Sequence, residues 1–190
     1  MTAPAGGAAP VGRPWSTFEL LVLAMLAALI VASNVALRLP IRMPGHSGLA
    51  WMALLVTGRS IVPRPGAAVI LGLLSGAVAV FLGVGDKGAL DTFVSYTAAG
   101  VGVELVALLL PVPGHPVAGA LAGAAGNLTK LGAKTLLELW IGIPTGIVLL
   151  GRAFPALTHL VFGLAGGYLG YLVVAALRRA GYFAYLAEKR

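Results

Sequence analysis

Residues 17–37, TFELLVLAMLAALIVASNVAL, decide the fold of this chain, because they form one apolar run with a single charge, Glu19. A membrane-spanning helix needs about 20 predominantly apolar residues, and this run has that length. Ser16 and Glu19 have the spacing of a capping box, in which each side chain bonds the backbone N–H of the other residue. The run therefore predicts a helix that begins beside Ser16 and crosses a bilayer.

The composition of the whole chain supports the same class. Of the 190 residues, 59% are hydrophobic and 10% are charged, and the mean hydropathy is +0.97, whereas a soluble domain carries about 25% charged residues. The net charge of +7 does not indicate a nucleic-acid partner, because the basic residues are scattered around apolar runs. The chain has no cysteine, which excludes a disulfide framework, a thiolate metal site and cysteine catalysis. We expect an all-α integral membrane protein.

Prolines and glycines divide the chain into about six spans, each close to the length that a bilayer requires. The expected spans are residues 17–37, 48–62, 66–84, 89–110, 116–150 and 153–177. The fifth is long and is interrupted by Gly142 and Pro144. We expect a disordered tail over 1–13, one transmembrane domain over 14–180 and a basic cytoplasmic tail over 181–190.

An even number of spans places both termini on one side of the membrane. That side then holds most of the basic residues, namely Arg13, Arg59, Arg64, Arg178, Arg179, Lys189 and Arg190, against Arg38, Arg42, Lys87 and Arg152 on the other side. Basic residues favour the cytoplasmic side. We therefore predict cytoplasmic termini in the plasma membrane, with the first, third and fifth connections facing outward.

A ladder of small residues lies in the first span. Ala24, Ala28 and Ala32 recur every four residues, and Ala36 continues the series, so they share one helix face. Such a face lets another helix approach closely in lipid. It is interpreted either as a docking face for another membrane subunit or as ordinary packing within this chain.

A polar stripe lies in the fifth span. Asn127, Lys130, Lys134 and Glu138 are spaced three or four residues apart and share a face. Ionisable groups at membrane depth are costly and normally face a cavity or a partner. We expect Lys134 and Glu138 to neutralise each other, which leaves Lys130 for an anion or a carbonyl. The stripe predicts solute binding; the alternative is a paired set that snorkels to the membrane surface.

Further candidates lie at the outward ends of other spans. A base, an imidazole and an aromatic ring can together hold a flat polar molecule, and the alternative is a set of interfacial anchors. These candidates are Arg42, His46 and Trp51 around the start of the second span, Asp91 and Tyr96 in the fourth, Trp140 in the fifth and His159 in the sixth. For His159 the alternative is hydrogen-bonded packing. Glu104, in the inner half of its span, is expected to pair with an arginine.

Several kinds of site have no signal. GVGDKG at 83–88 lacks the Lys-Ser/Thr pair of a phosphate-binding loop, and His46, His115 and His159 do not form an HExxH metal pair. We therefore expect no cofactor bound by this chain. A small membrane enzyme and a stand-alone channel remain alternatives to a solute-binding subunit.

The layout resembles the substrate-binding (S) components of energy-coupling factor (ECF) transporters, a branch of the ABC importers that takes up vitamins. The resemblance rests on the length, the six short spans, and the AxxxA face in AMLAALIVA at 24–32. It implies that Ala24, Ala28 and Ala32 dock a membrane coupling subunit, that two ATPase subunits use ATP, and that a vitamin-like solute binds near the outer surface.

Two runs are also similar to a particular branch of that family. VPRPGAAVILGLLSG at 62–76 and GVGVELVALLL at 100–110 resemble the branch for hydroxymethylpyrimidine or thiamine precursors. The two lysines of the polar stripe suit a carboxylate or a phosphate better than a cation, so the sequence does not decide the identity of the solute.

Overall fold

The computed structural model describes residues 14–36, 43–85 and 88–182, and these residues form helices without any strand. The elements are α1 (Thr17–Ala36), α2 (Gly48–Ile61), α3 (Ala67–Phe81), α4 (Ala89–Leu109), the 3₁₀ turn η1 (Val112–Gly114), α5 (Pro116–Trp140), α6 (Thr145–Leu150) and α7 (Ala153–Arg179). The expected all-α class is confirmed for this part of the chain. The tail predicted at 1–13 lies outside the described residues, as do residues 183–190 of the tail predicted at 181–190.

The predicted start of the first helix is confirmed in atomic detail. The Ser16 backbone N–H donates to Glu19 Oε2 at 3.0 Å, and the Glu19 N–H donates to Ser16 Oγ at 3.1 Å. These are the two reciprocal bonds of a capping box, and they satisfy backbone donors that the first turn leaves open. A short sequence spacing therefore sets where α1 begins.

The fifth expected span is wrong in its extent. Instead of one span over 116–150, α5 ends at Trp140 and the separate short helix α6 follows. Gly142 adopts a φ of +88°, which takes the chain out of the helix. Pro144 has no N–H to continue the hydrogen-bond ladder and restricts the residue before it. The two residues thus end α5 rather than merely interrupting it.

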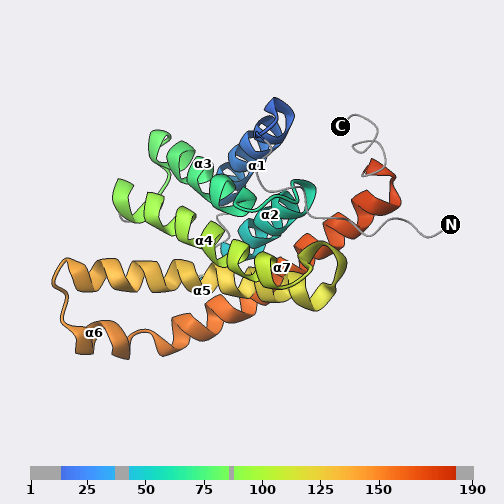
Figure 1. The fold of residues 1–190 in the computed structure, drawn as a ribbon. Helices are drawn as coiled ribbons and strands as arrows, with labels where there is room; N and C mark the ends of the chain where they lie inside the picture. Colours follow the sequence, from blue (N-terminus) through green and yellow to red (C-terminus); the bar gives the residue numbers. More distant parts are fainter. Residues whose placement is uncertain (1–13, 37–42, 86–87, 183–190) are drawn as a thin grey trace.

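The helices pack through glycine where they approach most closely. α5 lies between α4 and α7 (Figure 1). A Cβ added at Gly167 of α7 would stand 2.1 Å from the carbonyl oxygen of Gly119 in α5, and one at Gly123 would stand 2.3 Å from that of Gly163. Backbone-to-backbone contact of this kind replaces the hydrophobic driving force that is absent between helices in lipid.

This contact gives a prediction for stability. Gly167→Ala should lower the stability of the bundle by about 1–3 kcal/mol, because the new methyl group would overlap a backbone oxygen that cannot move alone. Gly132→Ala in α5 is the matched control: its Cβ meets nothing within 4 Å, and alanine favours a helix. The unfolding temperature measured in detergent should fall for Gly167→Ala and stay level or rise for Gly132→Ala. Equal unfolding temperatures for the two variants would contradict this close packing of α5 against α7.

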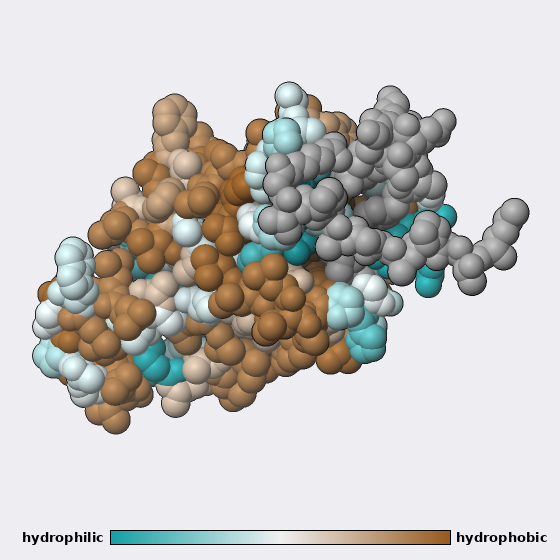
Figure 2. Space-filling model, in the orientation of Figure 1, coloured by the Kyte–Doolittle hydropathy of each residue, from teal (hydrophilic) through white to brown (hydrophobic). Residues whose placement is uncertain are grey.

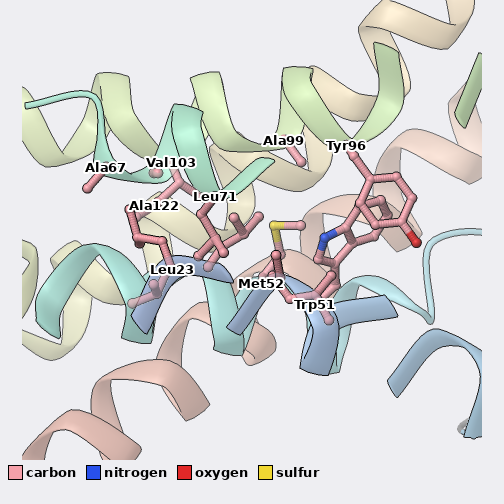
Figure 3. Close-up of a cluster of buried hydrophobic side chains, with 14 of the residues drawn as sticks. Leu23, Trp51, Met52, Ala67, Leu71, Tyr96, Ala99, Val103 and Ala122 are labelled. Atoms are coloured by element: carbon pink, nitrogen blue, oxygen red, sulfur yellow. The ribbon is translucent and has the colours of Figure 1, made fainter. Parts of the chain in front are cut away.

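A core of large side chains fills the centre of the bundle between α1, α2, α3 and α4 (Figure 3). Leu23, Met52, Leu55 and Leu71 are fully buried there. At one end of this core the rings of Trp51 and Tyr96 lie beside each other (Figure 3). The apolar core therefore gives way to polar aromatic side chains at that end.

Two buried ion pairs tie the helices together near the other end. Arg59 Nε donates to Glu104 Oε1 at 3.0 Å, and Glu104 Oε2 accepts the Ala68 N–H at 2.9 Å. Arg64 Nη1 donates to Glu19 Oε2 at 2.9 Å. The expected pairing of Glu104 with an arginine is confirmed. These pairs connect α2 with α4, and the α2–α3 turn with the start of α1.

The exterior fits a lipid environment. Among the described residues three helices, α1, α4 and α7, are long and apolar enough to cross a membrane, while α2 and α3 are shorter apolar helices. Hydrophobic residues cover most of the face on which α4, α5 and α7 lie (Figure 2). Because water disfavours so large an exposed apolar surface, the bundle belongs in a bilayer.

Candidate functional site

A small polar cavity lies between the ends of α1, α2, α4 and α5. Side chains from four helices and their connections form it, together with the backbone of Gly85. The described lining is Asn34, Ser47, Trp51, Gly85, Asp91, Thr92, Ser95, Tyr96, Lys130 and Lys134. The space left between them is about 50 Å³, which is room for one or two water molecules. A solute of several heavy atoms enters only if these side chains or the adjoining connections move apart.

Two aromatic rings and a lysine form one wall of the cavity. The ring centroids of Trp51 and Tyr96 are 3.9 Å apart at an angle of 50°. Lys130 Nζ lies 4.1 Å from the Trp51 ring centroid, a cation–π distance, and 3.4 Å from Ser47 Oγ. The Tyr96 hydroxyl accepts a bond of 2.9 Å from Asn34 Nδ2. The wall offers an aromatic face together with a positive charge.

An ion pair forms the opposite wall. Lys134 Nζ of α5 lies 3.2 Å from Asp91 Oδ2 in the first turn of α4, and both side chains are mostly buried. The carboxylate also sits at the helix N-terminus, where the macrodipole favours a negative charge. The pair thus holds α4 against α5 beside the cavity, and both of its residues line the cavity.

Close helix contacts place these groups. A Cβ at Gly48 would stand 2.4 Å from Asn127 Nδ2, and one at Gly126 would stand 2.8 Å from Met52 Sδ. The start of α2 therefore lies directly against α5, which puts Trp51 beside Lys130. Asn127 Nδ2 also donates to the His159 carbonyl oxygen of α7 at 2.8 Å. One asparagine thus joins three helices beneath the cavity.

Several buried polar atoms have no hydrogen-bond partner among the described residues. They are Trp51 Nε1, Ser95 Oγ and Asn127 Oδ1. Leaving a buried donor or acceptor unsatisfied costs about 1–3 kcal/mol, so most such groups in folded proteins have partners. Trp51 and Ser95 both line the cavity. Their unsatisfied atoms are the feature expected of a site that is completed by a ligand.

The structure brings together part of the predicted site. Trp51, Asp91, Tyr96, Lys130 and Lys134 all line the cavity. His46 lines an adjoining pocket that shares Asn34, Ser47 and Trp51 with it. Arg42 lies outside the described residues. The polar stripe is therefore divided, and only its two lysines reach the cavity.

The expected neutralisation of Lys134 by Glu138 is wrong. Lys134 pairs with Asp91, and Glu138 pairs with Arg152, which precedes α7. Partners on neighbouring helices approach these side chains more closely than the next turn of α5 does. Glu138 is thus paired with the connection that precedes α7, whereas Lys134 is paired with α4.

The remaining predicted residues have structural surroundings. His159 Nδ1 lies 2.8 Å from the Pro155 carbonyl oxygen one turn earlier, and the ring is buried against Gly45. This contact is the hydrogen-bonded packing considered as the alternative for that histidine. Trp140 is exposed at the end of α5. Neither residue lies in the cavity lining, nor does Asn127.

Several polar residues of the described lining were not predicted from the sequence. Asn34, Thr92 and Ser95 contribute polar groups to the cavity. Asn34 carried a usable signal, because an amide within an apolar span is costly unless it faces a partner or a cavity. Thr92 and Ser95 carried none, since hydroxyl side chains commonly bond the backbone of their own helix, as Thr92 also does with Gly88.

The alanine ladder of α1 faces outward. Ala24, Ala28 and Ala32 are exposed, whereas Leu23, Ala27 and Ile30 on the opposite face are buried in the core. Packing within the described part of this chain therefore does not use the ladder. A flat strip of small side chains remains open to lipid or to another helix.

Comparison with known proteins places the fold. No family model matches the sequence, and no curated protein matches it. A crystal structure of an S-component of an ECF transporter is similar, with a TM-score of 0.62 at 18% sequence identity, over 93% of this chain and 95% of that chain. At that identity the likeness concerns the fold. The chain therefore has, over nearly its whole length, the fold of that S-component.

Proposed function

We propose that this chain is the substrate-binding subunit of an ECF-type importer and captures a vitamin or vitamin precursor from outside the cell. The observation that carries the proposal is the cavity with buried, unsatisfied Trp51 Nε1 and Ser95 Oγ at one end of a bundle with the S-component fold. Binding a solute there supplies the missing hydrogen-bond partners. No covalent chemistry by this chain is needed.

The orientation in the membrane follows from the charges. In the proposed arrangement α1, α2, α3, α4, α5 and α7 are the six spans, and α6 belongs to the connection before α7. Both termini face the cytoplasm of a cell whose plasma membrane holds the protein. The cavity then lies beneath the outer surface of the membrane. Trp51 is in the first turn of α2, which begins at the outer side, and Lys134 is in the last two turns of α5, which ends at the outer side.

The lining narrows the chemistry of the solute. Trp51 and Tyr96 provide an aromatic face for a flat ring, and the Trp51 N–H requires an acceptor. The described lining holds two lysines, and an ammonium group suits a carboxylate or phosphate on the solute better than a cation. A hydroxymethylpyrimidine or thiamine-like solute is the alternative, and it would use Asp91 as its partner.

The exposed alanine strip supports the proposed partner. A strip without large side chains allows a helix of a coupling subunit to approach closely, and Ala24, Ala28 and Ala32 are open to it. Two ATPase subunits would bind that coupling subunit and use ATP. The energy for transport then comes from the partners, because solute binding alone moves nothing against a gradient.

Two measurements test the proposal. Native mass spectrometry of the gently purified protein should show a carried small molecule, which denaturation releases for identification. Proteoliposomes that contain this chain alone should bind that molecule and show almost no flux. Rapid flux would identify a channel or facilitator instead, and chemical conversion of the molecule would identify an enzyme.

A serine pair gives a sharper test of the cavity. Ser95→Ala should leave the unfolding temperature of the unliganded protein level or slightly raised, because it removes a buried hydroxyl that has no partner among the described residues. It should weaken solute binding about tenfold, as loss of one hydrogen bond in a buried site does. Ser75→Ala is the control, since Ser75 is equally buried but bonds the Leu71 carbonyl oxygen. Titration calorimetry should find its affinity unchanged; equal effects of both variants on affinity would refute this use of Ser95.

A further inference from the structure

The connection between α5 and α7 differs in composition from the two other connections at the same end of the proposed arrangement, residues 37–47 and 82–88. Residues 141–151, IGIPTGIVLLG, contain no charged side chain and only one polar one, Thr145. The connection at 82–88 carries Asp86 and Lys87, and the one at 37–47 carries two arginines. A water-exposed connection is normally polar. The solvent around residues 141–151 is therefore not simply water.

The structure leaves most of these apolar side chains uncovered. α6 lies at the tip of the α5–α7 hairpin, far from α1 and α3 (Figure 1). Leu150 is 88% exposed and Ile147 68% exposed, whereas Val148 between them is 5% exposed and faces inward. The short helix thus has one side against the protein and an apolar side that faces outward.

The apolar side of α6 continues into the lipid-facing surface of α7. Phe154, Leu157 and Val161 of α7 are exposed at intervals of three or four residues and share one face. Leu150, which ends α6 just before α7, is exposed as well. α7 is one of the helices long and apolar enough to cross a membrane. The exposed apolar surface of α7 therefore begins within a few residues of α6, with Arg152 between the two helices.

The residues on either side of this segment are those found at membrane surfaces. Trp140 immediately precedes it and is exposed, and Arg152 immediately follows it. Tryptophan and arginine are typical anchors at the boundary between headgroups and acyl chains. Arg152 Nη2 donates to Glu138 Oε2, so the charges beside the tip are paired across the base of the hairpin.

The tip is also not part of the cavity. The described lining contains residues of α1, α2, α4, α5 and their connections, and none from residues 141–152. In this structure the segment therefore does not cover the cavity as a lid, and a role in closing the site does not account for its exposed isoleucines and leucines.

We propose that α6 and its flanking residues lie flat in the headgroup–acyl boundary of the bilayer, on the side of the membrane where the cavity opens, and anchor that end of the α5–α7 hairpin. The occupant of the apolar face is phospholipid. A segment that lies in this boundary is buried only about 5–10 Å into it, so the exposed apolar side chains of α6 contact lipid while Val148 stays against the protein. The inference requires that the bundle spans a membrane, as the proposed function does.

The chain lacks cysteine, so single cysteines can carry a nitroxide label without further changes. Leu150→Cys and Ile147→Cys report on the tip in vesicles of phosphatidylcholine and phosphatidylglycerol. Val161→Cys is the reference within the membrane and Gly114→Cys, exposed in η1, the reference in water. Paramagnetic resonance measures how often each label collides with oxygen, which enters lipid, and with a nickel chelate, which stays in water.

Labels at residues 147 and 150 should show an oxygen-to-nickel collision ratio between the two references and at least fivefold above that of Gly114→Cys. A ratio equal to that of Gly114→Cys would place the tip in water and overturn the inference. Immobile labels that collide with neither reagent would show a protein partner, such as a second copy, and would overturn it as well.

Tryptophan fluorescence provides a second measurement without a label. In Trp15→Phe, brominated phospholipids should quench the exposed Trp140 more strongly than the buried Trp51, and the further change Trp140→Phe should remove most of that quenching. Unchanged quenching would contradict the inference. Solute binding is assayed on the same proteins, so a tip in water with intact binding refutes only this inference, while an anchored tip without binding refutes only the proposed function.

Discussion

Trp51→Ala is expected to weaken solute binding about 100-fold. The ring forms the aromatic wall of the cavity with Tyr96, lies under Lys130 Nζ, and carries a buried N–H with no partner among the described residues. Loss of stacking removes about 0.5–1.5 kcal/mol and loss of a buried hydrogen bond removes about 1–3 kcal/mol. Together these amount to about 1.5–4.5 kcal/mol, and the middle of that range, about 3 kcal/mol, corresponds to roughly 100-fold in affinity. Titration calorimetry with the solute identified by mass spectrometry measures the change.

The same substitution also lowers stability, so further variants are needed to interpret it. Trp51 is 3% exposed, and truncating a buried tryptophan costs about 3–5 kcal/mol. Trp51→Phe keeps an aromatic ring but removes the N–H, and should cost about tenfold in affinity with a small change in unfolding temperature. Trp140→Ala, which removes an exposed tryptophan, should leave affinity unchanged. An affinity of Trp51→Ala within threefold of the unaltered protein would exclude this cavity as the binding site.

Ala28→Leu is expected to abolish co-purification with the coupling subunit while solute affinity stays within twofold. Ala28 lies at the middle of the exposed strip between Ala24 and Ala32, so a leucine there holds a partner helix away by the length of a side chain. Close approach is what drives helix association in lipid. Because Ala28 is exposed, the larger side chain meets no atom of the core, and the isolated protein should fold as before.

The matched control for this variant is Ala77→Leu. Ala77 is an exposed alanine on α3, so the same change in volume is made away from the strip. Affinity purification of the coexpressed subunits should recover the coupling and ATPase proteins with Ala77→Leu and lose them with Ala28→Leu. If both variants retain the complex, the strip is not the docking surface; if both lose it, the effect is not specific to α1.

Local features of the fold could be predicted because their causes lie within a few residues. The capping box of Ser16 and Glu19 needs only one helical turn, and the structure shows both of its bonds. Gly142 and Pro144 were recognised as an interruption, but the sequence did not show that the chain would leave the helix there altogether. That outcome depends on α7 turning back along α5, which is a contact between distant segments.

The candidate site was predictable only in part, for the same reason. Helical periodicity grouped Lys130 and Lys134 correctly on one face, yet it paired Lys134 with Glu138 because both are on α5. The observed partner, Asp91, belongs to α4, and nothing in the spacing along α5 could indicate it. Asn34 was not predicted as a site residue because its role depends on the hydrogen bond to Tyr96, which belongs to another helix.

The sequence by itself determined that this chain is a bundle of apolar helices with a few polar residues that lipid would not tolerate alone, since hydrophobicity and helical period are properties of each segment. Only the tertiary structure decided which polar residues face one another, which of them remain unsatisfied, and that the alanine strip and the α6 tip stay uncovered. The physical reason is that two polar side chains pair only when their atoms come within about 3–4 Å of each other. Whether they do depends on how closely the helices approach, and this is set by glycine contacts such as that of Gly48 with Asn127.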